Sequence, residues 1–281
     1  MVRLMTRLNS SLLATALILT GCASPTVTTA QNAGQVPDTI VSAQILPGWT
    51  TADGTHMAGL MLTMAPGWKT YWRAPGDSGI APQFSWGGSK NLEDVEISWP
   101  RPKVEDINGL RVIGYTGTVV FPIEITPATK GAPVTVAAQL DLGVCEDVCV
   151  PVSLSLDAQL TGPGKHDARI SNALATLPIT AKQAKVREVT CGLEPTSDGM
   201  RITARLKMPK TGKTETVLIE AGDPDIWVSE SVSRRDGNTL IAVADLVPPN
   251  AQPFALNRGK VRFTILGAGQ SAVDITGCTA G

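Results

Sequence analysis

Short stretches of alternating apolar and polar residues, separated by Gly, Pro and Asn, recur along most of the chain. A period of two is the pattern of a half-buried β-strand. In the first half this pattern predicts strands at residues 59–64, 68–72, 95–99, 119–125, 134–142 and 152–157. Beyond residue 185 it predicts strands at 186–190, 200–206, 216–220, 226–230, 239–244, 261–266 and 271–275. Short strands at this spacing are typical of an immunoglobulin-like sandwich, so we expect an all-β fold with two such domains.

One segment between the two strand-rich halves has a helical period instead. Ile170, Leu174 and Leu177 are apolar at spacings of four and three residues. Asp167 precedes them as a candidate N-cap, and Pro178 follows as a stop signal. The pattern predicts a short helix that links the two halves.

The predicted division of the chain follows from these patterns. It comprises a signal peptide at 1–21, a flexible tether at 22–36, an immunoglobulin-like domain at 37–163, a helical linker at 164–185 and a second sandwich at 186–281. The length of 281 residues agrees with about two domains at roughly 150 residues each.

The amino-acid composition argues against a nucleic-acid partner. The formal net charge is only -1, charged residues make up 17% of the chain, and no run of like charges stands out. Nucleic-acid binding requires a basic surface, so we expect no nucleic-acid partner.

The first residues resemble an export signal. Arg3 and Arg7 precede an uncharged apolar stretch at 12–20, and Gly21-Cys22 then supplies the small residue before cysteine that lipoprotein processing requires. Cys22 would become the first mature residue and carry lipid. The alternative is an ordinary secretory signal that contains a cysteine.

Both alternatives place the mature chain outside the cytoplasm. No later stretch has the roughly 18 consecutive apolar residues of a membrane-spanning helix, so we expect membrane attachment only through lipid. Ala23 after the cysteine provides no Asp-type inner-membrane retention signal, which favours the outer membrane. The predicted location is periplasmic and lipid-anchored.

Four further cysteines remain in this oxidising compartment: Cys145, Cys149, Cys191 and Cys278. Free thiols seldom persist there. Four cysteines allow three pairings, and the spacing favours a close Cys145–Cys149 pair and a distant Cys191–Cys278 pair. We expect the distant pair to be structural.

The residues around the close pair define a register. The larger apolar residues at 134–142 and 152–156 fall at even positions. An antiparallel hairpin whose loop is Glu146-Asp147-Val148 would then place Leu142 opposite Val152 and Cys145 opposite Cys149. Opposed Cα atoms are about 4.5 to 5.5 Å apart, which is compatible with a disulfide. Because a three-residue hairpin loop usually ends in a left-handed residue, Val148 is unfavourable there, and a single helical turn is the alternative.

The odd positions of both cysteines place them on the polar face of this hairpin, near its tip. An accessible disulfide is open to attack by another protein's thiolate. The neighbouring Glu146 and Asp147 are expected to disfavour the thiolate form of these cysteines. A structural bond across the hairpin is the competing interpretation.

Several motifs resemble the amino-terminal periplasmic domain of the DsbD family, in particular its copper-sensitivity, ScsB-type branch. They are Trp68-Lys-Thr-Tyr-Trp-Arg-Ala-Pro-Gly-Asp77, Ile113-Gly-Tyr115, Phe121-Pro-Ile-Glu-Ile125 and Gly143-Val-Cys-Glu-Asp-Val-Cys-Val-Pro151. The resemblance covers about residues 40 to 160, and the second half resembles more loosely the extra sandwich of that branch.

The resemblance implies a thiol-disulfide oxidoreductase that works without a cofactor. Such a domain takes electrons from a membrane partner or a thioredoxin-like domain and passes them to periplasmic thiol-disulfide proteins. The sequence ends at Gly281 without a membrane or thioredoxin-like domain, so the expected donor is a separate protein.

Site residues follow from the same resemblance. Cys145 and Cys149 match the family's redox pair, with three intervening residues where the best-known members have five. Residues 105–110 fall where the family has a cap loop over the cysteines. The aromatic often found there is missing, so Ile107 or Leu110 would have to shield the pair.

Tyr71 and Asp106 are the residues expected by position to flank the cysteines. Two other classes of function remain open. His56, Met57, Met61 and Met64, with the two thiols, are the soft ligands that copper(I) prefers, although a methionine stripe also suits a core strand. A purely structural lipoprotein that binds a partner through its sandwiches is the third alternative.

Overall fold

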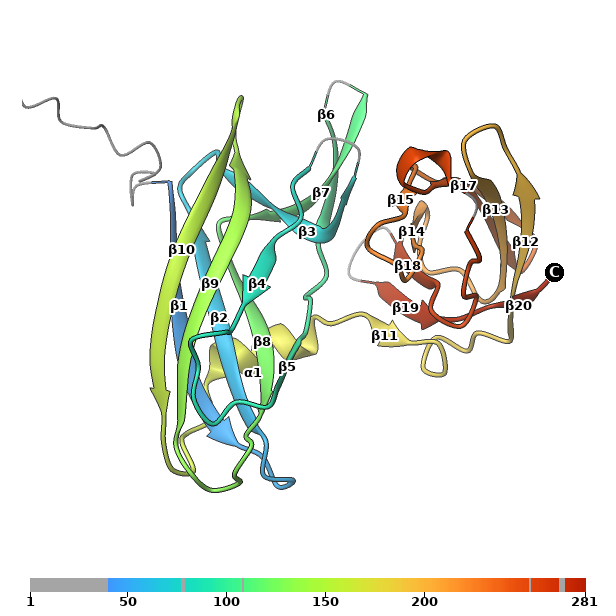
Figure 1. The fold of residues 1–281 in the computed structure, drawn as a ribbon. Coiled ribbons are helices and arrows are strands. Elements are labelled where there is room, and N and C mark those ends of the chain that lie inside the picture. The colour runs from blue at the N-terminus through green and yellow to red at the C-terminus, as the bar shows by residue number, and fades with distance from the viewer. Residues whose placement is uncertain (1–39, 77–78, 108, 253, 268–270) are drawn as a thin grey trace, which may run out of the picture. The chain divides into compact units, whose positions relative to one another are not determined.

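The computed structural model describes residues 40–76, 79–107, 109–252, 254–267 and 271–281. The predicted signal peptide and tether, including Cys22, lie outside these residues. Within them strands dominate, and the predicted all-β, immunoglobulin-like fold is confirmed (Figure 1).

The first sandwich consists of two facing sheets. Its strands are β1 (Val41–Thr50), β2 (His56–Met64), β3 (Lys69–Gly76), β4 (Gln83–Ser85), β5 (Asp94–Ile97), β6 (Lys103–Ile107), β7 (Leu110–Thr116), β8 (Thr118–Thr126), β9 (Val134–Cys145) and β10 (Cys149–Leu160). One sheet has the order β1-β2-β8-β5 and the other β10-β9-β3-β7-β6, with β4 pairing to β9 beside β3. β10 is therefore an edge strand, whereas β9 has neighbours on both sides.

Alternation along the strands explains how the two sheets pack. Leu60 and Leu62 on β2, Phe121 and Ile123 on β8, and Trp72 on β3 are almost completely buried in one core. Burying such side chains contributes about 1.5 to 3 kcal/mol each. The core holds the second sheet in a fixed position, and with it the cysteine hairpin.

The predicted register of the β9–β10 hairpin is confirmed. Leu142 lies opposite Val152 and Cys145 opposite Cys149. Val148 is not among the described non-glycine residues with positive φ, so the tip closes without the left-handed residue that made a hairpin questionable. Glu146 donates its backbone N–H to the Val148 carbonyl across the tip, at 3.3 Å.

The segment expected as a cap loop is instead the end of a β-hairpin. Residues 103–107 form β6 and residues 110–116 form β7, paired antiparallel with Ile107 opposite Leu110. Neither strand was predicted from the sequence: β6 is mostly polar, and β7, although Val112, Ile113 and Tyr115 on it are buried, lacks a strict alternation of apolar and polar residues. Asn108-Gly109 is nevertheless a strong sequence signal for a two-residue turn. Gly109 has φ +80°, as such a turn requires.

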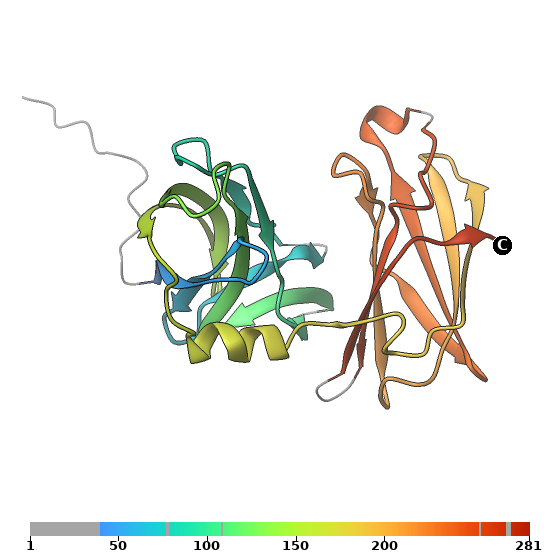
Figure 2. The ribbon, with the colours of Figure 1, turned by 90° about the horizontal axis from the view of Figure 1, so that it is seen from below.

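The predicted helix is α1 (Ala168–Ala175), and Asp167 accepts the Arg169 backbone N–H as its N-cap. It does more than connect two domains, because it packs against β8 of the first sandwich (Figure 2). Ile170 is fully buried, and a Cβ on Gly59 of β2 would lie 2.8 Å from its Cγ1. The glycine therefore allows the helix to approach the sheet closely.

The second sandwich also has two sheets. Its elements are β11 (Ile179–Thr180), β12 (Glu188–Pro195), β13 (Met200–Lys207), β14 (Glu215–Glu220), β15 (Trp227–Val228), β16 (Val232–Asp236), β17 (Thr239–Val247), the 3₁₀ helix η1 (Pro249–Ala251), β18 (Arg262–Gly267), β19 (Ala272–Thr276) and β20 (Thr279–Ala280). The sheet orders are β11-β19-β18-β14 and β15-β17-β13-β12-β20, with β16 pairing to β17. Cys191 on β12 is bonded to Cys278, with Cα atoms 5.9 Å apart.

None of the helices in the described part of the chain is both long and apolar enough to cross a membrane.

Candidate functional site

The Cys145–Cys149 disulfide closes the tip of the β9–β10 hairpin, with Cα atoms 4.1 Å apart. The two sulfur-bearing residues differ in accessibility. Cys145 is 3% exposed, whereas Cys149 lies on the edge strand and is exposed. The sequence pattern placed both on one polar face and could not separate them, because the difference comes from what lies over β9.

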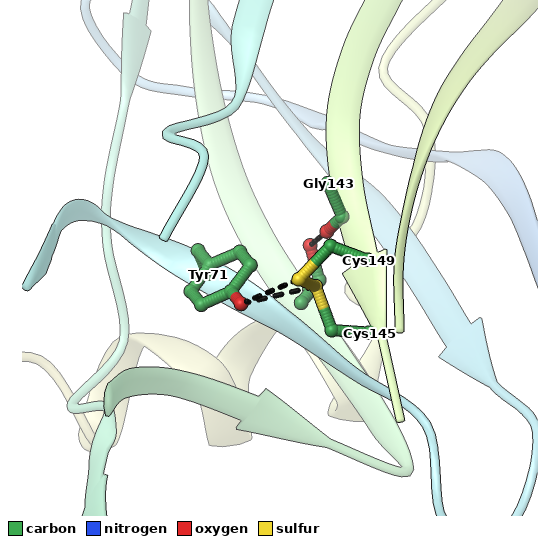
Figure 3. The surroundings of a disulfide bond; sticks show 5 residues. Tyr71, Gly143, Cys145 and Cys149 are labelled. Atoms are coloured by element: carbon green, nitrogen blue, oxygen red, sulfur yellow. Dashed lines mark hydrogen bonds between the residues drawn. A yellow bond between two sulfur atoms is a disulfide. The ribbon is translucent and has the colours of Figure 1, made fainter. Parts of the chain in front are cut away.

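Tyr71 is the polar group that contacts the bond. Its hydroxyl donates to Cys145 Sγ at 3.0 Å and lies 3.3 Å from Cys149 Sγ (Figure 3). Burial raises the pKa of the Tyr71 phenol above its ordinary value of 10.0. The hydroxyl therefore stays protonated at neutral pH and can donate to either sulfur.

The pairing of β3 with β9 positions Tyr71. Thr70 is fully buried, and its hydroxyl donates to the Gly143 carbonyl at 2.9 Å, which fixes β3 against β9. Side chains alternate along a strand, so Tyr71 lies on the opposite face from Thr70, beside the cysteines. The Trp68–Asp77 motif thus supplies both the strand that pairs with β9 and the donor to its sulfur.

The β6–β7 hairpin covers the inner sulfur. Ile107 and Val112 pack in one cluster with Tyr71 and Cys145. Its tip and the tip of the cysteine hairpin lie at the same end of the sandwich (Figure 1). An aliphatic side chain, Ile107, therefore covers Cys145 from this hairpin.

The other two residues expected in this cap are placed differently. Leu110 is 47% exposed and is not part of the cluster around Cys145. Asp106 accepts the Gly109 backbone N–H at 3.0 Å, so its carboxylate closes the turn of the cap hairpin. Asp106 thereby shapes the cap, and the hydrogen bonds to the sulfurs come from Tyr71.

Residues 79–80 form a second cover, over Tyr71 and Gly143, which was not predicted from the sequence. A Cβ on Gly79 would lie 2.6 Å from the Tyr71 ring, and a Cβ on Gly143 would lie 2.8 Å from the Ile80 side chain. Both glycines therefore permit close packing around the tyrosine. Ile80 is partly exposed and Val148 is 71% exposed, so apolar surface remains accessible near Cys149.

Lys69 was also not predicted from the sequence as a residue of the site. It lies opposite Cys145 in the β3–β9 pairing, and its ammonium is 3.9 Å from the Glu105 carboxylate of β6. Its position inside the quoted Trp68–Asp77 motif was the available signal.

The soft ligands considered for copper are not brought together. On β2, His56 and Met64 are buried on the core side, whereas Met57 and Met61 alternate to the other side. His56 Nε2 lies 2.5 Å from the Pro47 carbonyl oxygen. Within the described residues, no group of three or more His, Cys, Asp or Glu side chains is arranged to hold a metal ion.

The fold and this site together define a class of protein: an immunoglobulin-like sandwich with a disulfide at an accessible hairpin tip. Residues 42–160 match the family described as thiol:disulfide interchange protein DsbD, N-terminal. This stretch, somewhat less than half of the chain, is therefore similar to a DsbD N-terminal domain.

A solved structure extends the similarity to most of the chain. It is the N-terminal periplasmic domain of ScsB from Proteus mirabilis, with 23% identity and a TM-score of 0.63, covering 86% of this chain and 92% of that one. At this identity the likeness concerns the fold. A search of curated proteins finds no match to this chain.

Proposed function

We propose that this protein is a thiol-disulfide interchange protein that relays electrons through Cys145 and Cys149. The observation that supports this best is the asymmetry of the pair, in which an exposed Cys149 is bonded to a buried Cys145. A purely structural disulfide does not require a hydrogen bond to one of its sulfurs, such as the one that the Tyr71 hydroxyl donates. In thiol-disulfide exchange the same phenol hydroxyl stabilises the thiolate that leaves when the disulfide is broken.

The first step follows from this geometry. A thiolate of the reduced donor attacks Cys149 Sγ, a donor–Cys149 disulfide forms, and the Cys145–Cys149 bond breaks with its electron pair on Cys145 Sγ. Tyr71 already donates to that sulfur. Hydrogen bonds to charged groups are worth about 1.5 to 3 kcal/mol, so the Tyr71 hydroxyl lowers the energy of the released Cys145 thiolate.

A second exchange completes the transfer. The donor's other thiolate attacks the donor sulfur of the mixed disulfide, and Cys149 leaves as a thiolate. The donor is now a disulfide, and Cys145 and Cys149 have gained two electrons. The reduced pair passes them on when Cys149 attacks a disulfide of the acceptor and Cys145 then resolves the mixed disulfide.

The chemistry of this relay defines its partners. The donor is a membrane or thioredoxin-like protein with a dithiol, and the acceptors are thiol-disulfide proteins of the periplasm. No cofactor is required, since the sulfurs themselves carry the electrons. A periplasmic location agrees with the similarity to a domain whose title describes it as periplasmic.

The anchor is part of the proposal. Leu19-Thr20-Gly21-Cys22 supports lipid attachment at Cys22, with the outer membrane favoured. Cys22→Ser should move the protein from the membrane fraction to the soluble periplasm, as measured by cell fractionation. An unchanged membrane fraction would contradict the lipid anchor.

Trapping of a partner tests the relay directly. The exposed sulfur has to be the one retained, so Cys145→Ser leaves Cys149 to hold a mixed disulfide that cannot be resolved. The matched control is Cys149→Ser, which leaves only the buried Cys145. We expect covalent complexes, cleaved by reductant and containing thiol-disulfide proteins, with the first variant and far fewer with the second.

The opposite outcomes are equally clear. Absence of mixed disulfides from cells that express the Cys145→Ser variant, folded and exported as the parent, would refute the relay. Equal trapping by both variants would refute the assignment of Cys149 as the attacked sulfur.

A further inference from the structure

Lys69 is the basic residue closest in register to the inner cysteine. β9 lies between β10 and β3, so Cys145 has Cys149 opposite it on one side and Lys69 on the other. Directly opposed residues in an antiparallel ladder have Cβ atoms about 4.5 to 5.5 Å apart. Tyr71, two residues along the same strand, already contacts the sulfurs from this face.

The Lys69 side chain is engaged elsewhere while the disulfide is closed. Its ammonium lies 3.9 Å from a Glu105 carboxylate oxygen, and the lysine side chain is only 16% exposed. Glu105 belongs to β6, the outer strand of the cap hairpin. Lys103 of the same strand donates from its ammonium to the Thr116 hydroxyl at 2.7 Å, so it is engaged within the cap.

Opening the disulfide changes the charge beside this lysine. When Cys149 is attacked, the electron pair of the broken bond remains on Cys145 Sγ, and a buried neutral sulfur becomes a thiolate. A nearby ammonium favours a thiolate, and the four-carbon stem of lysine lets the ammonium swing between two acceptors. The competing acceptor, Glu105, is carried by the element that covers the sulfur.

We propose that Lys69 is a positioning residue that stabilises the Cys145 thiolate, and that Glu105 holds the Lys69 ammonium away from the sulfur while the cap is closed. The inference rests on the proposed thiol-disulfide exchange and deepens it. Movement of the cap hairpin during docking releases Lys69 from Glu105, so partner binding favours bond opening. The lysine keeps its proton throughout, and the step transfers only the electron pair between sulfurs.

The test measures the pH midpoint of thiolate formation at Cys145. In a Cys149→Ser background with Cys191–Cys278 intact, ultraviolet thiolate absorbance reports Cys145 after subtraction of the Cys145→Ser Cys149→Ser double variant. Around Cys145, Tyr71 contacts the sulfur, Lys69 lies opposite in the ladder, and Glu105 is the partner of Lys69. Lys103 lies two residues before Glu105 on β6, and Glu146 and Asp147 follow Cys145 at the tip. Only Lys69 and Glu105 are changed.

The two changes have opposite expected effects. In the Cys149→Ser background, Lys69→Met should raise the pH midpoint of thiolate formation at Cys145. With Cys149 present, the same change should slow reduction of the Cys145–Cys149 disulfide by glutathione about threefold to tenfold. Lys69→Arg should restore both, since it keeps the charge. Glu105→Gln should lower the midpoint and speed reduction, and its effect should shrink in a Lys69→Met background.

Contrary results overturn the proposal. These are an unchanged midpoint with Lys69→Met, a failure of Lys69→Arg to restore it, or a Glu105→Gln effect that is equally large without Lys69. The outcome is independent of trapping: if partners are trapped but the midpoint does not move, only the role of Lys69 fails. If the midpoint moves but no partner is trapped, the relay fails and Lys69 remains the electrostatic partner of Cys145.

Discussion

At the scale of single residues, the site depends on an inequality between two cysteines that occupy equivalent positions in sequence. Cys145 is enclosed by Tyr71, Ile107 and Val112, whereas Cys149 on the edge strand is exposed. A partner can therefore reach one sulfur while the protein controls the other. In the proposed exchange, this division makes Cys149 the sulfur that the partner attacks and Cys145 the sulfur that leaves.

Tyr71→Phe should isolate the contribution of the hydroxyl. The ring remains to pack beneath residues 79–80, while the donor to Cys145 is lost. We expect reduction of this disulfide by dithiothreitol to slow about tenfold, since a hydrogen bond to a charged group is worth about 1.5 kcal/mol or more. Stopped-flow measurements with the untouched Cys191–Cys278 bond as internal reference would check it.

The same variant has a predictable pH dependence. Burial raises the pKa of the Tyr71 phenol, so the neutral, donating form is present below the ordinary value and is lost only as pH rises through the elevated one. The rate ratio between parent and Tyr71→Phe should therefore stay constant from about pH 6 to about pH 9. A ratio that collapses within this range would contradict a neutral phenol donor.

Residue roles were partly accessible from sequence alone. The cysteines and Tyr71 stand in motifs, so resemblance identified them as candidates. The unequal burial of the cysteines and the position of Lys69 opposite Cys145 depend on which strand pairs with the other side of β9. That pairing is between segments far apart in the chain, and no local pattern encodes it.

At the scale of elements, the cap hairpin covers Cys145, and we predict that it controls access to this cysteine. Ile107 packs against Tyr71 and Cys145, and Leu110, its partner across the turn, is exposed. The two residues provide a matched comparison on one hairpin. Ile107→Ala opens the cover, whereas Leu110→Ala removes a side chain that contributes little to it.

We expect Ile107→Ala to accelerate alkylation of reduced Cys145 severalfold and to leave the melting temperature almost unchanged, since the residue lies at a hairpin end. Leu110→Ala should alkylate at the parental rate. Mass spectrometry of the modified cysteine distinguishes Cys145 from Cys149. Equal rates in parent and Ile107→Ala would show that the β6–β7 hairpin does not control access.

The elements differ in how well sequence defines them. The β9–β10 register was predictable because the alternation fixes which residues face the core, and the short loop Glu146-Asp147-Val148 then selects one match. A slip of one residue would expose every apolar side chain. Helix α1 was predictable from its period and Asp167 cap. The cap strands were not predicted because β6 is mostly polar and because β7, although it buries Val112, Ile113 and Tyr115, lacks a strict alternation of apolar and polar residues.

At the scale of the whole molecule, the described residues include two disulfides with different expected consequences for stability. The Cys191–Cys278 bond spans 87 residues, for which loop-closure entropy gives a stabilisation of about 4 to 5 kcal/mol. Cys191 is also completely buried in the core of the second sandwich. These features are those of a structural bond.

Replacing Cys191 and Cys278 by serine should lower the melting temperature of the second sandwich by roughly 10 °C or more. The Cys145→Ser Cys149→Ser variant is the natural control, because its bond closes a loop of only a few residues and contributes about 2 kcal/mol at most. Differential scanning calorimetry would compare them. Equal destabilisation by the two double variants would contradict the division into structural and redox bonds.

The central claim is that Cys145 and Cys149 cycle between disulfide and dithiol while the fold stays intact. Graded reduction in glutathione buffers, followed by alkylation and mass spectrometry, tests it most directly when far- and near-ultraviolet circular dichroism is recorded on the same samples. We predict that the Cys145–Cys149 bond opens first, with unchanged spectra and with Cys191–Cys278 intact. Opening of Cys191–Cys278 first, or resistance of Cys145–Cys149 until the protein unfolds, would show that the hairpin disulfide is structural.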